Sequence, residues 1–221
     1  MSRYDAVIFD LDGTLCRNVQ DLDAAYRRAF DAVGLDPLGE PTELWGALEG
    51  PPDPDDRVGY LATGFARLLT QHGVDGDPLD LAAALLAEFD ATQVAFLPDA
   101  ERVLARLRGR YRLGVLTNGP RRHQAAKVEA LGLADRVDAV VYAGDLPRRK
   151  PLPLPFETIC DRLTVEPGRA LYVGDSLAHD VAGAGVAGLD AAWIRTDGAE
   201  PAPYRPRFVL DSLGDLLDEL A

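Results

Sequence analysis

Two aspartates separated by a single residue lie near the start of the chain, in Asp10-Leu11-Asp12-Gly13-Thr14-Leu15. On an extended strand such residues project from one face, so the two carboxylates reach a single site. Carboxylates this close repel each other unless a cation neutralises them, and Mg²⁺ is a hard ion that prefers oxygen ligands. The pattern predicts a magnesium site, with an Asp-x-Asp-Gly turn that has no chemistry as the alternative.

Two further aspartates occur late in the chain. Asp175, in Gly174-Asp175-Ser176, ends a predicted strand and is a natural metal ligand. Asp180 follows near the start of a predicted helix, where it would ligate the metal or orient a metal-bound water. Ordinary capping of that helix is the alternative for Asp180. We expect His123 and His179 to be loop residues, because the surrounding oxygen donors favour a hard ion.

A hydroxyl and an ammonium group complete the candidate site. Thr117-Asn118-Gly119 offers a hydroxyl and turn N–H groups that suit phosphate oxygens, although a simple turn has the same sequence. Lys150, followed by Pro151, is one of two lysines in a chain with 21 arginines. Its retention indicates a need for a compact ammonium between phosphate and carboxylate, and an exposed, solvated lysine is the alternative.

Each of these motifs follows a predicted strand. Short β-branched and aromatic runs predict buried strands at 4–10, 111–117, 137–142, 170–174 and 191–194. Helical patterns separate most of them, at 100–109, 121–131, 155–163 and 180–187. We also expect an edge strand at 208–210 and a closing helix at 212–220. This alternation predicts an α/β fold with a Rossmann-like parallel sheet and helices on both faces, and such sheets bind ligands at their carboxyl edge.

One long segment breaks the alternation. Residues 19–92 carry helical patterns at 22–33, 58–71 and 79–92 but no convincing strand. Prolines 37 and 41 and the cluster at 51–54 predict loops between these helices. We therefore expect an all-helical second domain at 17–94, inserted into an α/β core made of 1–16 and 95–221.

Composition restricts the partners. The net charge of -13 on 221 residues argues against binding to nucleic acid or anionic membranes. The opening segment is too short and too charged for a signal peptide, so we expect a cytoplasmic protein with two free cysteines. An acidic, lysine-poor chain resembles the proteins of salt-adapted organisms, although screening explains the acidity and not the shortage of lysine, and a GC-rich genome that favours Arg and Ala is the alternative. The sequence indicates no oligomeric state.

Taken together, these motifs resemble the four motifs of the haloacid dehalogenase superfamily, and the helical insert is similar to the cap of its phosphoglycolate phosphatase-like members. The resemblance implies a phosphatase acting on a small phosphorylated metabolite, with Asp10 as nucleophile and Asp12 as general acid and base. It implies that Asp10, the backbone carbonyl of Asp12 and Asp175 hold Mg²⁺, with Asp180 nearby. Thr117, Asn118 and Lys150 would bind the phosphoryl group.

Three other functions are compatible with such a fold. True dehalogenases of this superfamily lack the second aspartate, so the presence of Asp12 argues against dehalogenation. A sugar-phosphate mutase shares all four motifs, and a binding or regulatory module that has lost turnover shares the fold. We expect the leaving group to be recognised by residues of the cap, for which the candidates are Arg17, Asn18, Trp45, Arg57 and Tyr60.

Overall fold

The computed structural model describes residues 3–49, 56–195 and 198–221. The chain divides into two compact units, one of Met1–Asn18 with Ala91–Ala221 and one of Val19–Asp90. These limits lie within a few residues of the predicted domain boundaries, while the function of the helical unit as a cap stays a prediction. None of the helices in the described residues has the length and hydropathy needed to span a membrane.

Within the described part of the first unit, six parallel strands form one sheet in the order β5-β4-β1-β6-β7-β8. The strands are β1 (Ala6–Phe9), β4 (Arg112–Thr117), β5 (Ala139–Tyr142), β6 (Ala170–Gly174), β7 (Asp190–Ile194) and β8 (Phe208–Leu210). Phe9, the last residue of β1, pairs with Val115 of β4 and Val173 of β6. All six predicted strands are present, which confirms the α/β fold class.

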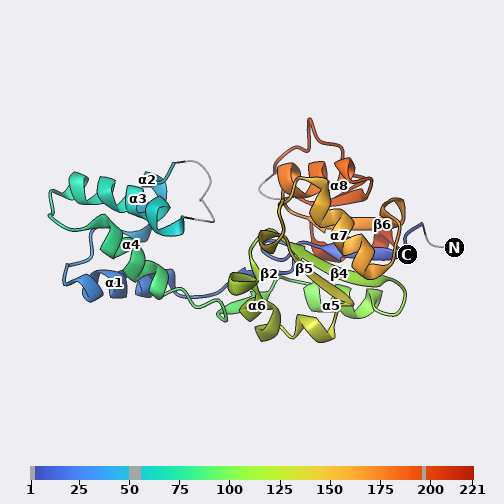
Figure 1. Cartoon of the computed structure of the whole chain (residues 1–221), viewed down its shortest axis with the longest axis horizontal. Helices are drawn as coiled ribbons and strands as arrows, with labels where there is room; N and C mark the ends of the chain where they lie inside the picture. The colour runs from blue at the N-terminus through green and yellow to red at the C-terminus, as the bar shows by residue number, and fades with distance from the viewer. Residues whose placement is uncertain (1–2, 50–55, 196–197) are drawn as a thin grey trace. The chain divides into compact units, whose positions relative to one another are not determined.

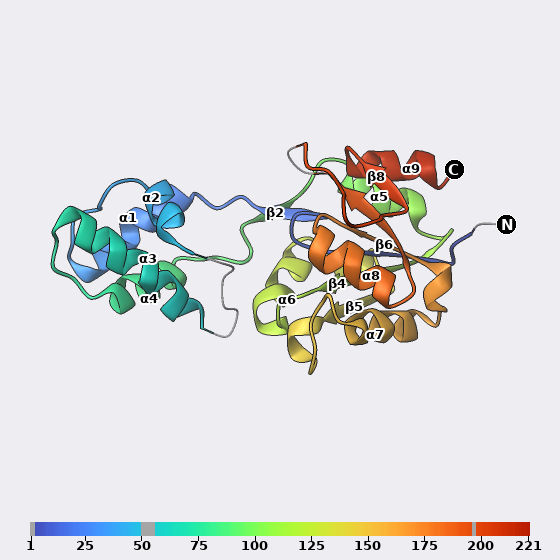
Figure 2. The ribbon, with the colours of Figure 1, turned by 90° about the horizontal axis from the view of Figure 1, so that it is seen from above.

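The alternation of side chains along the strands builds two cores. Val7 and Phe9 point to the face covered by α5 (Ala100–Leu107), α6 (Arg121–Ala130) and α9 (Leu216–Glu219). Ala6 and Ile8 point to the face covered by α7 (Pro153–Leu163) and α8 (Ala182–Val186). Figure 1 shows α7 and α8 on one side of the strands and α5 and α6 on the other, and Figure 2 shows α9 beside α5. Because each buried aliphatic side chain contributes about 1.5–3 kcal/mol, these cores fix β1 at the centre of the sheet.

Several shorter elements complete this unit. Single-turn helices lie at η1 (Leu133–Asp135), η2 (Ala143–Asp145), η3 (Pro167–Arg169) and η5 (Leu213–Asp215), and a π-helical turn, η4 (Leu177–Val181), leads into α8. Two three-residue strands, β2 (Cys16–Asn18) and β3 (Val94–Phe96), pair antiparallel where the chain leaves for the helical unit and returns from it. Both are too short to give an alternating pattern, so the sequence did not predict them.

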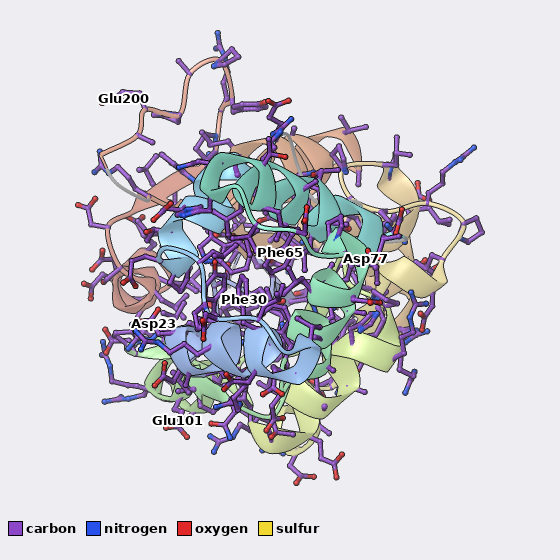
Figure 3. The ribbon with its side chains drawn as sticks, turned by 90° about the vertical axis from the view of Figure 1, so that its left-hand side faces the viewer. Asp23, Phe30, Phe65, Asp77, Glu101 and Glu200 are labelled. Atoms are coloured by element: carbon purple, nitrogen blue, oxygen red, sulfur yellow. The ribbon has the colours of Figure 1, made fainter. Side chains whose placement is uncertain are left out.

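The helical unit has its own core. The unit consists of α1 (Leu22–Val33), α2 (Pro41–Ala47), α3 (Arg57–His72) and α4 (Pro78–Ala87). The rings of Phe30 and Phe65 meet edge to face between α1 and α3, with centroids 5.9 Å apart (Figure 3). An independent core of this kind allows the insert to fold as a domain.

The prediction of a loop at Pro41 was wrong, because this proline is the first residue of α2. Proline lacks an N–H group, and the N–H groups of the first helical turn have no partner within the helix, so proline suits that position. Glu40 and Glu43 exchange capping contacts around it. The predicted loop at 51–54 lies outside the described residues.

Candidate active site

The predicted site residues meet at the carboxyl edge of the sheet. Strand β1 lies between β4 and β6, and the strand order reverses there, which is where open α/β sheets form a crevice. A cavity of about 220 Å³ lies at this edge. Among the residues that line it are Asp10, Asp12, Thr117, Asn118, Lys150 and Asp180. Asp175, the remaining predicted residue, contributes a carboxylate next to those of Asp10 and Asp180.

Lys150 is the most connected of these groups. Its Nζ lies 2.8 Å from Oδ1 of Asp10 and 2.7 Å from Oδ1 of Asp180. It also donates to the hydroxyl of Tyr172 at 2.9 Å, so all three ammonium hydrogens have acceptors. Burial lowers the pKa of Lys150, but the charges of Asp10 and Asp180 outweigh it and the pKa is raised. Lys150 is therefore a buried cation, and the alternative of an exposed lysine is excluded.

Asn118, which directly follows β4, fixes the backbone of Lys150. Asn118 Oδ1 accepts from the N–H of Lys150 at 2.8 Å, and its Nδ2 donates to the carbonyl of Lys150 at 3.1 Å. Thr117 is buried, and its Oγ1 accepts from the N–H of Gly119 at 3.4 Å. The turn after β4 thus positions the lysine as well as offering the hydroxyl and N–H groups predicted for phosphate.

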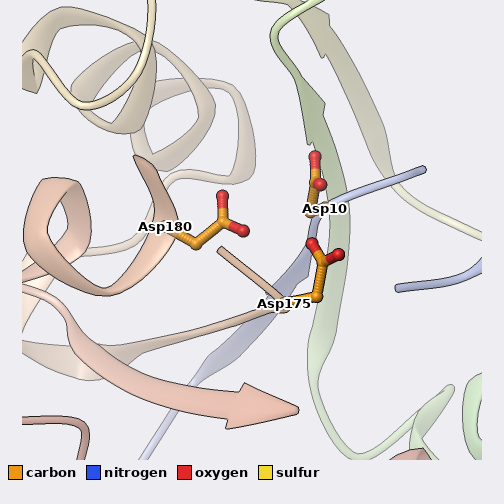
Figure 4. Close-up of side chains that lie close together, drawn as sticks. All are labelled: Asp10, Asp175 and Asp180. Carbon is orange, nitrogen blue, oxygen red and sulfur yellow. The ribbon is translucent and has the colours of Figure 1, made fainter. Parts of the chain in front are cut away.

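Three carboxylates converge beside Lys150. Asp10, Asp175 and Asp180 each offer an oxygen within 4.8 Å of the others, and Figure 4 shows the three side chains facing one space. Burial raises the pKa of Asp10 to about 7, with Lys150 opposing and Asp180 reinforcing the shift. Burial and the charge of Asp180 also raise the pKa of Asp175. Burial therefore disfavours the ionised forms of Asp10 and Asp175, and a nearby cation would favour them.

The donor set fits Mg²⁺. Three carboxylates and one ammonium leave two negative charges, and carboxylate oxygens are the ligands that this hard cation accepts. The carboxylate of Asp12 is not part of the group, because its oxygens accept from Gln124 and Lys127. Asp12 is predicted to bind the metal through its backbone carbonyl, and that assignment stays a prediction.

Two glycines of the motifs make room for this group. Gly13 has a φ of +80°, which favours glycine, and a Cβ there would collide with the carboxylate of Asp175. A Cβ on Gly174 would collide with the carboxylate of Asp180 in the same way. The motif glycines are therefore needed for the close approach of the acidic side chains, besides any role in turning the chain.

Asp180 does not cap the predicted helix. It lies inside the π-helical turn η4, and its Oδ2 accepts from the N–H of Ser176 at 3.0 Å. Ser176 caps the turn instead, through its contact with the N–H of His179. Asp180 has an exposed fraction of only 1% and pairs with Lys150. The capping alternative is therefore excluded.

Sequence reasoning missed several polar side chains that support the site. Tyr172 of β6 accepts from Lys150 and donates to the carbonyl of Leu116 at 3.0 Å, and burial raises its pKa well above the usual value. Trp193 Nε1 donates to the carbonyl of Asp175 at 2.9 Å. Both residues look like ordinary core positions in the sequence. Lys127 could have been found from the sequence, since it is the other of the chain's two lysines.

The candidate residues for recognition of the leaving group lie in two places. Trp45, Arg57 and Tyr60 line a cavity of about 460 Å³ on the helical unit, together with Phe89 and two leucines. Arg17 and Asn18 are exposed residues of β2. The structure thus brings three of the five candidates together.

Comparison with known proteins identifies the family. The haloacid dehalogenase-like hydrolase model matches residues 4–188. The chain is 38% identical to phosphoglycolate phosphatase of Rhodospirillum rubrum, over 83% of this chain and 76% of that protein. It is 32% identical to glyceraldehyde 3-phosphate phosphatase of Methanopyrus kandleri, over 96% and 95%. It is 40% identical to N-acylneuraminate-9-phosphatase of Rattus norvegicus over 109 residues, which span 49% of this chain and less than half, 44%, of that protein.

The carboxylate group predicts how the protein responds to magnesium. Mg²⁺ should raise the melting temperature of the wild type, because binding to the folded state alone adds about 2.7 kcal/mol at 100 times Kd. Asp175→Asn should lose most of this rise, whereas Asp12→Asn, outside the carboxylate group, should keep it. Calorimetry with and without MgCl₂ checks both variants. An equal rise in Asp175→Asn and the wild type would contradict the site.

The raised pKa of Asp10 predicts a gain in stability on neutralisation. A carboxyl whose folded pKa is about 7 binds its proton more tightly in the folded state, so ionisation destabilises the metal-free protein as pH rises from 4 to 8. Asp10→Asn should therefore melt a few degrees higher than the wild type at pH 8 in EDTA. The difference should vanish near pH 4. Asp31→Asn, on the exposed face of α1, is the control.

Proposed function

The chain belongs to the haloacid dehalogenase-like hydrolase family, and we propose that it is a Mg²⁺-dependent phosphatase that forms an aspartyl-phosphate on Asp10. One observation carries the proposal. The Asp10 carboxylate lies in a cavity beside a buried ammonium, while the carboxylate of Asp12, two residues on, lines the same cavity and has separate donors. A nucleophile and a separate proton carrier are the two acidic groups that this chemistry requires.

In the first step, a carboxylate oxygen of Asp10 attacks phosphorus. The bond between phosphorus and the ester oxygen breaks with its electron pair on that oxygen, and the Asp12 carboxyl donates a proton to it. The products are the aspartyl-phosphate and the free alcohol. Asp12 suits this role because its side chain is 44% exposed at the cavity, within reach of the leaving group.

In the second step, a water molecule attacks the phosphorus of the aspartyl-phosphate. The Asp12 carboxylate accepts the proton of this water, and the bond between phosphorus and Asp10 breaks. Inorganic phosphate leaves, and both aspartates return to their starting states. One residue serves as acid and then as base, so the proton is conserved over the cycle.

Positive charge and hydrogen-bond donors make the attack of one anion on another feasible. The Thr117 hydroxyl and the backbone N–H of Asn118 would donate to the phosphoryl oxygens, and Lys150 would bind them through its positive charge. Mg²⁺, held by Asp10, Asp175, Asp180 and the Asp12 carbonyl, would supply further positive charge to those oxygens. Donors fixed before the reaction cost no reorganisation during it, which makes this the largest contribution in many enzymes. Asn118 and Tyr172 preorganise Lys150 through its backbone and its Nζ.

We propose a small organic phosphate as the substrate. Relatives that match most of this chain are named for phosphoglycolate and glyceraldehyde 3-phosphate. The helical unit would act as a cap that recognises the leaving group, with Trp45, Arg57 and Tyr60 as its candidate contacts.

Phosphate release tests the proposed function directly. Wild-type protein with MgCl₂ should release inorganic phosphate from at least one member of a panel that includes 2-phosphoglycolate and glyceraldehyde 3-phosphate. Asp10→Asn should abolish release because no nucleophile remains. Asp12→Asn should lower kcat by roughly 10²–10⁴, the usual contribution of an acid or base. Intact-mass spectrometry should detect phosphoenzyme in Asp12→Asn and none in Asp10→Asn.

The control is Asp31→Asn, which removes a surface charge and should leave the rate unchanged. Full activity of Asp10→Asn would overturn the assignment of the nucleophile. No phosphate release from any ester would overturn the phosphatase, and phosphate moving within a sugar would indicate a mutase.

A further inference from the structure

The Asp12 carboxylate is held by two side chains of α6. Lys127 Nζ lies 2.7 Å from Oδ1, and Gln124 Nε2 donates to Oδ2 at 2.8 Å. The thiol of Cys16 lies 3.9 Å from Oδ1. Lys127 and Gln124 are three residues apart, so they share one face of the helix. Each carboxylate oxygen therefore has its own donor from α6.

We propose that Lys127 and Gln124 are positioning residues that fix the Asp12 carboxyl group, each of whose oxygens keeps a second lone pair, for proton transfer to the leaving group. The inference rests on the proposed function. Asp12 follows β1 and its side chain is 44% exposed, so packing alone does not select its rotamer. A donor on each oxygen fixes the plane of the carboxylate. Proton transfer needs this because donor and acceptor must come within hydrogen-bonding distance in the correct orientation.

The environment of Gln124 indicates that its role is the contact with Asp12. Gln124 is 8% exposed, and within the described part of the chain its Oε1 is buried without a hydrogen-bond partner. A buried acceptor with no partner costs about 1–3 kcal/mol. An amide is thus a costly choice at this position unless its Nε2 has a use.

Gly119 supports the same interpretation. A Cβ at this position would collide with the amide of Gln124. The glycine of the turn after β4 therefore leaves the space through which Gln124 reaches Asp12. The contact between Gln124 and Asp12 therefore depends on the turn after β4 as well as on α6.

Lys127 is unusual for its residue type. The chain has 21 arginines and two lysines, and both lysines pair with an aspartate of the first motif, Lys150 with Asp10 and Lys127 with Asp12. Partly exposed pairs contribute only about 0–1 kcal/mol to stability, so folding alone gives little reason for this contact. A compact ammonium contacts one oxygen as a point charge and leaves the other to Gln124.

Two substrates whose leaving groups differ in their need for a proton can distinguish a positioning role from ordinary structural support. p-Nitrophenolate is a stable anion that leaves without a proton, whereas the alkoxide of benzyl alcohol needs one. The two phosphate esters are similar in shape, so they make similar demands on binding. Because kcat/KM covers the steps up to alcohol release, it reports the acid step and not the later attack by water.

The experiment compares kcat/KM for benzyl phosphate and p-nitrophenyl phosphate in Lys127→Met and Gln124→Met. Each variant should lose roughly 10–100-fold on benzyl phosphate, up to the lower range of acid catalysis, and about threefold or less on p-nitrophenyl phosphate. The ratio of the two values does not depend on the folded fraction, because both are measured on one preparation. The double variant Asp12→Asn/Lys127→Met should have the same ratio of the two kcat/KM values as Asp12→Asn alone, because Lys127 then has no carboxyl group to position.

Arg122→Met is the matched control, since it removes an exposed cation from the same helix and should leave the ratio unchanged. Equal losses on both esters in Lys127→Met and Gln124→Met, or no loss on either, would overturn the inference while leaving the phosphatase intact. A wild type that turns over neither these esters nor any other would overturn the proposed function and this inference with it.

Discussion

The buried ammonium of Lys150 is the constraint on which the site depends. Removing a cation from water costs several kcal/mol unless each of its hydrogens finds an acceptor. Here the acceptors come from three separate elements, through Asp10 after β1, Tyr172 in β6 and Asp180 in η4. These elements must therefore meet for the lysine to be buried. The same requirement explains why Asn118 fixes its backbone and why Gly174 leaves space for Asp180.

The charges divide the site into two parts. Lys150 pairs with Asp10 and Asp180, and with Asp175 beside them the three carboxylates leave an excess of two negative charges. Lys127 pairs with Asp12, so this part of the site has one ammonium for one carboxyl group. The proposed divalent cation would neutralise the first group, whereas the second already has its own ammonium. Two carboxylates only two residues apart thus acquire different environments, which is how one motif can supply both a nucleophile and a proton carrier.

Much of the fold could be predicted from the sequence, because buried parallel strands leave strong apolar runs and the polar residues that follow them must lie at one edge of the sheet. Contacts that depend on packing could not be predicted. Whether Gln124 and Lys127 reach Asp12 depends on how α6 packs on the sheet, and the helical pattern does not contain that information. The position of Asp180 inside a π-helical turn could not be predicted either, since its spacing from Asp175 also fits an ordinary helix cap. Pro41 shows that a helix-breaking residue also begins helices.

Under the proposed function, the division into two units separates chemistry from recognition. Every residue assigned to phosphoryl transfer lies in the α/β unit, and the contacts that support these residues also come from that unit. The helical unit has its own aromatic core, so its surface residues can change without disturbing Lys150 or the carboxylates. Relatives named for different phosphate esters match this chain over most of its length. A fixed α/β site combined with a separately folded helical unit gives a physical reason why one family acts on different esters.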